Sequence, residues 1–403
     1  MSLVENVAPD TGEPAPGAAF QAGPVFALAG GHMAHDVSTN TVPMLLAHFV
    51  ERFGLSNTLA GWLAACTSLP ALLQPVFGHL ADRLVLRWVM ILGPAATATL
   101  MSLAGWVSGY AVFALVFTSA GIASAAFHAV GSAAVGRVSA RHLGRGLSIW
   151  MVGGELGATL GPIVAAGILT ALGVRGMSLL LVLGWGASLV LYLQLRRVRF
   201  RTAAHTERPP ARESLVRMRR LMLVMIGLVA LRAMALSAPT VFAPIMIKEE
   251  GGSDLLAGAA VTLFQAAGMV GTLAAGWLSD RVGRRLILVS ASLAGPAGLL
   301  LFIAVGGWSR FLFLTLAGLA TVAIHPVCMA LVQESFPESR GLANALYLSS
   351  VFVISSVAAV VIGTLGDAIG LRTAFVISGG VTFLSIPLIF LLPKDRRPAR
   401  TSR

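Results

Sequence analysis

Twelve runs of mainly apolar residues follow one another along the 403-residue chain, each bounded by charged residues or turn formers. A helix that crosses a bilayer needs roughly 20 predominantly apolar residues, and the runs are of about that length. They cover residues 22–49, 57–80, 88–108, 110–134, 146–170, 176–195, 221–247, 255–278, 286–305, 308–332, 341–364 and 372–393. The pattern predicts an all-α integral membrane protein with twelve transmembrane helices.

Composition supports this interpretation. Only 11% of the residues are charged, against about 25% in soluble domains, and the mean hydropathy is +0.83. These values exclude an ordinary soluble enzyme. The two cysteines, Cys66 and Cys328, both lie inside apolar runs, so we expect neither a disulfide framework nor a metal site.

Positive charge is concentrated on one side of the predicted bundle. The even-numbered connections and the C-terminal tail hold 23 of the 29 lysines and arginines, whereas the odd-numbered connections hold five. Such an excess is typical of cytoplasmic loops. It predicts a multi-pass protein of the bacterial inner membrane with both termini in the cytoplasm, and it explains the net charge of +12 without a nucleic-acid partner.

Polar segments divide the chain into five parts. Residues 1–21 are rich in Pro, Gly and Ala and lack basic residues, which predicts a disordered tail and not a secretory signal. The stretch 196–220 is the one long polar connection, and its nine arginines predict a cytoplasmic linker attracted to lipid headgroups. It separates two six-helix bundles, 22–195 and 221–393, and a basic tail follows at 394–403.

The two predicted bundles are related by an internal repeat. Gly78-x-x-x-Asp82-Arg83 returns 198 residues later as Gly276-x-x-x-Asp280-Arg281. His128 returns as His325 and Arg145-Gly-Leu as Arg340-Gly-Leu, at nearly the same offset. Because six helices are an even number, both halves enter the membrane in the same sense, which predicts a parallel repeat of two bundles.

Residues 276–285 resemble the signature Gly-x-Leu-x-Asp-Arg-x-Gly-Arg-Arg of the major facilitator superfamily, and residues 78–87 resemble it with Val85 in place of Gly. The resemblance implies a secondary transporter with a gate at these two turns. The gating residues would be Gly78, Asp82, Arg83, Gly276, Asp280 and Arg281. Glycine would allow close helix approach, and the Asp would lie near the positive N-terminal end of a neighbouring helix.

A few polar side chains interrupt the apolar runs near mid-depth. A charge at the centre of a membrane helix costs about 2.5–3.5 kcal/mol, so such groups face the protein interior and are candidates for function. They are His32, His35, Asp36, Asn40, His128, Glu155, Arg232, Gln265 and His325. Most lie in runs 1, 4, 7 and 10, which line the central cavity in the fold that the chain resembles.

Two chemical roles follow for these groups. His32, Asp36 and Asn40 share one helix face with His35 beside them, and a His next to an Asp can hold a proton near neutral pH. We therefore predict proton coupling by His32, His35 and Asp36, with Glu155 as a further acid; the alternative is a packing network.

Arg232 cannot be neutralised, so it needs either a carboxylate, from Asp36 or Glu155, or an anionic substrate. We predict substrate binding by Asn40, His128, Arg232, Gln265 and His325.

Run 5 contains Gly153-Gly154-x-x-Gly157-x-x-x-Gly161-Pro162. Small residues four apart allow tight helix contact and Pro can bend the helix, so Gly157, Gly161 and Pro162 are predicted to serve packing. The Gly-Pro element resembles a motif of major facilitator exporters. Together with Gly31-His32-Met-Ala-His35-Asp36 and Phe127-His128, it resembles the fosmidomycin-resistance type of drug exporter.

These observations predict a monomeric transporter that exports a small organic compound or drug by alternating access, as an antiporter driven by protons. No nucleotide-binding motif is present in the sequence, so we expect a proton gradient and no cofactor. One alternative is proton-coupled uptake of an organic anion held by Arg232. The other is a membrane-embedded enzyme that uses His128 and Asp36.

Overall fold

The computed structural model describes residues 20–83, 86–139, 142–196, 198, 211–336 and 340–393. Nearly all of these residues are helical, and none of them forms a strand, which confirms the all-α prediction. The predicted tails, apart from Phe20 and Gln21, and the linker up to residue 210, apart from Arg196 and Val198, lie outside the described residues.

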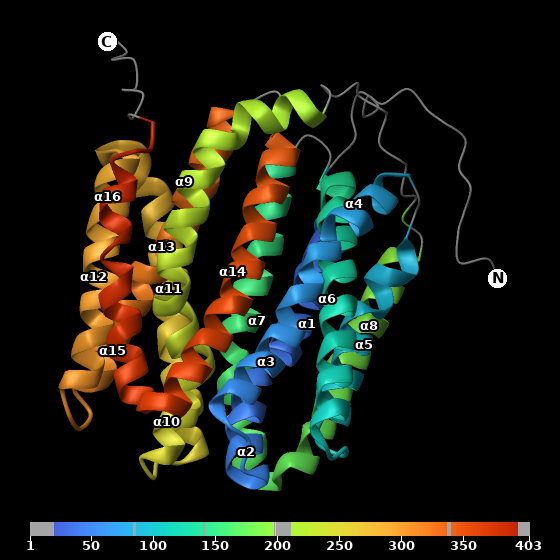
Figure 1. The fold of residues 1–403 in the computed structure, drawn as a ribbon. Helices are drawn as coiled ribbons and strands as arrows, with labels where there is room; N and C mark the ends of the chain where they lie inside the picture. The colour runs from blue at the N-terminus through green and yellow to red at the C-terminus, as the bar shows by residue number, and fades with distance from the viewer. Residues whose placement is uncertain are drawn as a thin grey trace.

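The first half consists of six helical units built from α1 (Ala22–Thr39), α2 (Val42–Phe53), α3 (Asn57–Ser68), η1 (Leu69–Leu73), α4 (Gln74–Arg83), α5 (Arg87–Leu103), α6 (Tyr110–Ser139), α7 (Leu143–Leu172), η3 (Val174–Ser178) and α8 (Leu179–Leu195). The second half repeats the arrangement with α9 (Ala211–Ser237), η4 (Ala238–Phe242), α10 (Ala243–Glu249), α11 (Asp254–Val282), α12 (Arg284–Ala304), α13 (Arg310–Ser335), α14 (Arg340–Ile369), α15 (Leu371–Thr382) and α16 (Ser385–Ile389). Figure 1 shows the helices running side by side in one bundle.

Ten helical stretches among the described residues are long and apolar enough to cross a membrane. The two other predicted spans are α5, which has 17 residues, and the pair α1–α2, which is interrupted at Asn40–Thr41. The polar Thr39-Asn40-Thr41 sequence and Pro43, at the first turn of α2, explain the interruption, because proline cannot donate a backbone hydrogen bond inside a helix.

The first helical unit of the second half is interrupted at the equivalent place. There η4 separates α9 from α10, with Pro239 in its first turn. Ala238 lies 198 residues after Asn40, the same offset as the sequence repeat. In addition, α9 begins at Ala211, inside the predicted linker, because no Pro or Gly follows Pro210 until Gly227.

We call the face at which α4, α6 and α13 end the basic face, and the face formed by α2 and α10 the opposite face (Figure 1). Near the opposite face one buried apolar cluster takes residues from both halves, among them Phe117 and Phe264. Near the basic face the core divides into two clusters, one within each half. The two halves are therefore joined by apolar packing at the opposite face.

Close contacts and polar pairs reinforce this junction. An added Cβ at Gly61 of α3 would lie 2.6 Å from the carbonyl oxygen of Ala359 on α14, so glycine is required for that approach. Asp367, at the end of α14, accepts hydrogen bonds from the backbone N–H groups of Asn57 (2.7 Å) and Thr58 (2.9 Å) at the start of α3. The arrangement closes the opposite face.

Candidate functional site

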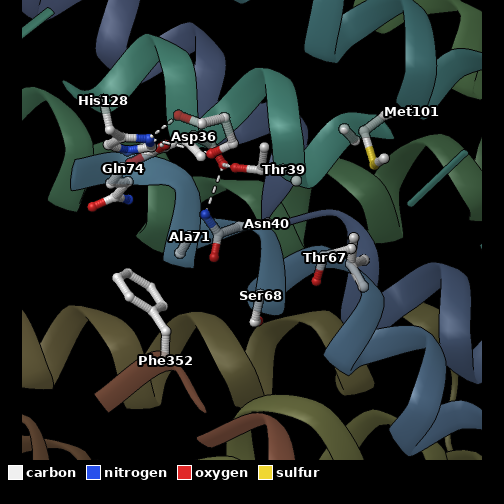
Figure 2. Close-up of a pocket in the computed structure, with 15 residues that line it drawn as sticks. Asp36, Thr39, Asn40, Thr67, Ser68, Ala71, Gln74, Met101, His128 and Phe352 are labelled. Carbon is white, nitrogen blue, oxygen red and sulfur yellow. Dashed lines mark hydrogen bonds and ion pairs between the residues drawn. The ribbon is translucent and has the colours of Figure 1, made fainter. Parts of the chain in front are cut away.

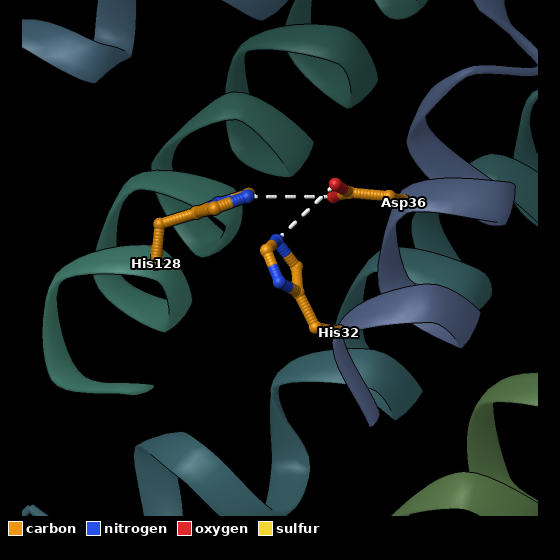
Figure 3. A group of neighbouring side chains, drawn as sticks. All are labelled: His32, Asp36 and His128. Carbon is orange, nitrogen blue, oxygen red and sulfur yellow. Dashed lines mark ion pairs between the residues drawn. The ribbon is translucent and has the colours of Figure 1, made fainter. Parts of the chain in front are cut away.

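Asp36 on α1 lies between two histidine side chains (Figure 3). Its Oδ2 atom is 3.2 Å from Nε2 of His32, one turn earlier on the same helix, and its Oδ1 atom is 3.4 Å from Nε2 of His128 on α6. We call these three residues the Asp36 cluster. His32 is buried and Asp36 is 13% exposed at the side chain, so the group lies inside the bundle.

The hydrogen bonds of the Nδ1 atoms of His32 and His128 determine where protons can lie in the cluster. Nδ1 of His32 is 2.9 Å from the carbonyl oxygen of Trp150, and Nδ1 of His128 is 2.9 Å from that of Ser124. A carbonyl oxygen only accepts, so both Nδ1 atoms carry a hydrogen. A neutral ring then presents a lone pair at Nε2 toward the Asp36 carboxylate, and each contact needs one further proton to become attractive. The cluster is thus built to hold one or two protons.

His35 has a different environment. It is completely buried, with Nδ1 3.0 Å from the Thr97 hydroxyl and Nε2 3.0 Å from the Ser124 hydroxyl. Its Nε2 is 3.9 Å from Asp36, and its ring stacks on Phe127. Two hydroxyl partners satisfy both ring nitrogens, which favours a role in packing and in positioning Ser124.

The glycines of α7 bring that helix against α1. A Cβ at Gly154 would lie 2.4 Å from Cε1 of His32, and one at Gly157 would lie 2.5 Å from the carbonyl oxygen of Met33. Gly161 faces Asn40 in the same way, and the Trp150 ring stacks on His32 at 4.0 Å. The glycine spacing therefore sets the position of the His32 ring. Pro162, inside α7, approaches Gly258 of α11 across the junction of the halves.

A polar cavity of about 280 Å³ opens beside the Asp36 cluster (Figure 2). Asn40, whose amide donates to the Asp36 carbonyl oxygen, lines it next to His128. The hydroxyl and amide groups of Thr39, Thr67, Ser68, Gln74 and Ser124 surround it, and Phe352 of α14 closes it from the second half. A ligand in this cavity would touch the cluster directly.

A second cavity of about 200 Å³ lies between the halves and is lined by Glu155 of α7, Arg232 of α9 and His325 of α13. Arg232 is 6% exposed, and its Nη2 donates to the carbonyl oxygen of Thr321 at 2.6 Å. Its Nε has no hydrogen-bond partner within the described part of the chain.

Among the described residues Arg232 forms no ion pair with Asp36 or Glu155, the carboxylate alternative that the sequence left open. Asp36 is held by the histidines instead, and Glu155 lines the Arg232 cavity outside salt-bridge distance.

His128 and His325 occupy equivalent positions in the repeat but have different partners. His128 joins the Asp36 cluster, whereas His325 stacks on Tyr347 and lies 3.3 Å from its hydroxyl. Gln265 is half-buried on α11 and lines neither of the two cavities. The structure thus divides four of the five predicted substrate residues between two separate cavities and leaves Gln265 outside both.

At the two predicted gate turns, the glycines make no close contact with a neighbouring helix. A Cβ at Gly78 or Gly276 would meet no atom within 4 Å, so the close helix approach expected there is not made in this conformation. Asp280 is largely exposed and lies 3.8 Å from Arg284, while Arg281 stacks over Trp277. The side chains of Asp82 and Arg83, at the end of α4, lie outside the described residues. Both turns are at the basic face, where the buried apolar clusters of the described residues each belong to one half, which agrees with the missing contacts.

Sequence reasoning missed three residues that complete these sites. Trp150 and Ser124 hold the histidines, and Tyr347 holds His325. A Trp just before Gly153-Gly154 and a Ser one turn before His128 were the available signals. The ligand atoms of His32, Asp36 and His128 all lie within 4.8 Å of one another, so this group could also hold a metal ion; the sequence predicts none, and that stays a prediction.

Fold and site together define a polytopic helical protein of two repeated bundles, with one polar cavity beside Asp36 and one mainly apolar cavity beside Arg232. The sequence profile of the Major Facilitator Superfamily matches residues 28–314 and 225–403, and the chain belongs to this superfamily. It is a transporter and not an enzyme.

Similar proteins agree with this assignment. The chain is 24% identical to the fosmidomycin resistance protein of Escherichia coli (strain K12), with 92% of each chain covered. It is 25% identical to an uncharacterised MFS-type transporter of Bacillus subtilis (strain 168), with 91% of each covered.

Among solved structures, an inward-facing, occupied bacterial homologue of the lysosomal transporter Spinster superposes with a TM-score of 0.77 at 14% identity, over 91% of this chain and 96% of that one. A nucleoside transporter superposes with a TM-score of 0.76 at 13% identity, over 92% and 100% of the two chains. The expected fold and the resemblance to the fosmidomycin-resistance type are confirmed.

Proposed function

We propose that this protein is a proton-coupled secondary transporter that exports a small organic compound or drug across the bacterial inner membrane. The observation that carries the proposal is the Asp36 cluster, in which two histidines with fixed Nδ1–H groups face one carboxylate beside a cavity. The similarity to a resistance protein supports export. A similar fold also occurs in a D-xylose–proton symporter, with a TM-score of 0.69, 17% identity and coverage of 92% of this chain and 97% of that one.

Alternating access would rock the two halves about the cavities between them. The described conformation is closed at the opposite face, and the positive-charge distribution supports placing the basic face in the cytoplasm. A proton gradient supplies about 1.4 kcal/mol per pH unit, and the membrane potential adds about 2.3 kcal/mol per charge for each 100 mV. Either is enough to drive severalfold accumulation.

The test is Asp36→Asn in proteoliposomes, with fosmidomycin as the first substrate because of the similar resistance protein. Asn mimics the protonated acid permanently, so we expect exchange of substrate to continue while pH-driven accumulation is lost. Glu334→Gln is the matched control, because Glu334 pairs with Arg284 within one half at the basic face. Full pH-driven accumulation by Asp36→Asn would contradict Asp36 as the proton site, and Glu155 would become the candidate to test next.

A second candidate function is uptake of an organic anion. Arg232 favours it, because a buried guanidinium without an ion-pair partner is suited to bind an anion. A growth assay with the drug and an uptake assay with a radiolabelled carboxylate would separate the two directions: protection from the drug indicates export, and accumulation of the carboxylate indicates uptake.

A further inference from the structure

The Arg232 cavity differs in chemistry from the polar cavity beside Asp36. Its walls are mainly aliphatic or thioether side chains, contributed by both halves, including Met151, Val229, Leu236, Val322, Met329 and Val351. One cationic group, Arg232, and one acid, Glu155, lie among them. The cavity therefore combines an apolar surface with a single fixed positive charge.

Arg232 forms no ion pair with any acidic side chain in the described part of the chain. The guanidinium donates to the Thr321 carbonyl oxygen, which offers only a partial negative charge, and Nε is buried without an acceptor. Arg cannot lose its proton, and a buried charge without a counter-ion is expensive. A ligand with one negative charge would supply both a counter-ion for the guanidinium and an acceptor for Nε.

We propose that this cavity binds a small monoanion with an apolar body, such as an aromatic or short aliphatic carboxylate, and that the anion binds together with a proton on Glu155. The inference rests on the proposed function only in placing the cavity on the transport route.

The proton linkage follows from the geometry of the cavity. Glu155 reaches it from α7 on the first half, while Arg232 and His325 reach it from α9 and α13. The lining residues from α11 and α14, Thr272, Val351 and Ser355, are not titratable. On the α1 side, Asp36 and His32 are the electrostatic neighbours of Glu155.

An ionised Glu155 would repel a second carboxylate placed at Arg232, because like charges at close range favour protonation of one of them. By linkage, anion binding then takes up a proton, and acid pH strengthens binding.

The test is calorimetric titration of the purified full-length protein in detergent with benzoate and with benzamide, its neutral counterpart, at pH 5.5 and 7.5. We expect benzoate to bind and benzamide not to bind, with tighter benzoate binding at the lower pH. Titrations in buffers of different ionisation enthalpy should show proton uptake. Equal binding of the two compounds, or no binding of benzoate at millimolar concentrations, would overturn the proposed ligand class.

Three variants locate the site. Arg232→Gln should weaken benzoate binding at least tenfold, and Arg232→Lys, which keeps the charge, should retain the preference for benzoate over benzamide. Glu155→Gln should bind benzoate with the same affinity at both pH values. Glu334→Gln, at the basic face and outside both cavities, should behave as the unmodified protein. Unchanged binding by Arg232→Gln, or a persistent pH dependence in Glu155→Gln, contradicts the inference.

This result is separable from the proposed coupling. No gradient exists in detergent, so anion binding can fail while Asp36-dependent accumulation succeeds. Conversely, Asp36→Asn should leave the preference for benzoate over benzamide intact even if it abolishes accumulation.

Discussion

At the scale of single residues, the proposed coupling depends on where ring nitrogens point. In that proposal the Asp36 cluster serves as a proton site because backbone carbonyls, which cannot donate, hold both Nδ1 atoms. The same ring without such a partner could turn its N–H toward the carboxylate and satisfy it without an extra proton. Positioning by α7 is therefore as important as the identity of His32.

Gly154→Ala tests this positioning. The added methyl group would lie 2.4 Å from the His32 ring, which must then move away from Asp36. We expect a loss of about 1–3 kcal/mol in stability, as for other overpacked interiors, together with impaired pH-driven accumulation. Thermal unfolding in detergent and proteoliposome transport measure the two effects.

Gly167→Ala is the matched control on the same helix, since a Cβ there meets nothing within 4 Å. An alanine at Gly154 that leaves both stability and coupling unchanged would show that α7 does not position His32.

Local spacing along one helix predicted part of this site, and the rest was out of its reach. The four-residue interval between His32 and Asp36 placed both on one face of α1, as the structure shows. The contact with His128 joins residues 92 positions apart, and the Trp150 carbonyl is invisible in side-chain patterns. The sequence left open whether Arg232 pairs with a carboxylate or binds an anion, because charge alone does not tell which helix face a residue occupies.

At the scale of helices, the two halves are linked at the opposite face by a side chain of one helix that caps the start of another. The start of α3 has backbone N–H groups without partners in its own helix, and Asp367 of α14 accepts two of them. The Thr58 hydroxyl donates to the same carboxylate at 2.6 Å. Because α3 and α14 belong to different halves, these bonds must break before the opposite face can open.

Asp367→Ala should therefore increase the population that is open at the opposite face. Three hydrogen bonds at about 0.5 kcal/mol each, the low end of the usual range, amount to about 1.5 kcal/mol, so we expect a shift of about tenfold and no unfolding. Electron-spin distance measurements between labels at Arg175 and Trp308, exposed residues in different halves, would detect it.

Glu334→Ala, which breaks a pair inside one half, should leave the distances unchanged. An unchanged distribution for Asp367→Ala would mean that apolar packing alone closes this face.

A second polar group at the opposite face predicts a pH dependence. Glu250 is 2.5 Å from Arg310 and 2.8 Å from Arg372, and although burial opposes this, their hydrogen bonds hold the pKa of Glu250 below its usual value of 4.5. A lowered pKa gives a stabilisation that is complete above the unfolded value and disappears as the pH falls through the folded one. The pair joins the loop after α10 to the starts of α13 and α15.

We expect the unfolding temperature to fall as the pH drops below 4.5, and Glu250→Gln to reduce that dependence while lowering stability near pH 7. Differential scanning fluorimetry of both proteins measures it. The idea fails if the two profiles differ by a constant offset.

At the scale of the whole molecule, the repeat predicted the architecture but not the conformation. Apolar runs and the offset of 198 residues sufficed for two six-helix halves. Which face is closed depends on packing between the halves, such as Gly61 against Ala359, that has no signature within either run. The helix breaks at Asn40 and Ala238 were likewise not predicted, because each lies inside a run whose overall hydropathy is high despite its polar residues and prolines.

Charge asymmetry then assigns a side to each face, and this assignment can be tested. With Cys66 and Cys328 replaced by alanine, single cysteines at Arg208 and at Gly306 supply one reporter in the basic linker and one between α12 and α13 at the opposite face. A Cβ at Gly306 meets nothing within 4 Å, so the substitution should be tolerated. In intact cells a membrane-impermeant maleimide should label the Gly306 position only, and the Arg208 position should react only after permeabilisation. Labelling of both positions from the same side would contradict the topology, and labelling of Arg208 alone from outside would invert it. Only with the basic face inside does the face without a shared apolar cluster lie toward the cytoplasm, the side from which an exporter loads its substrate.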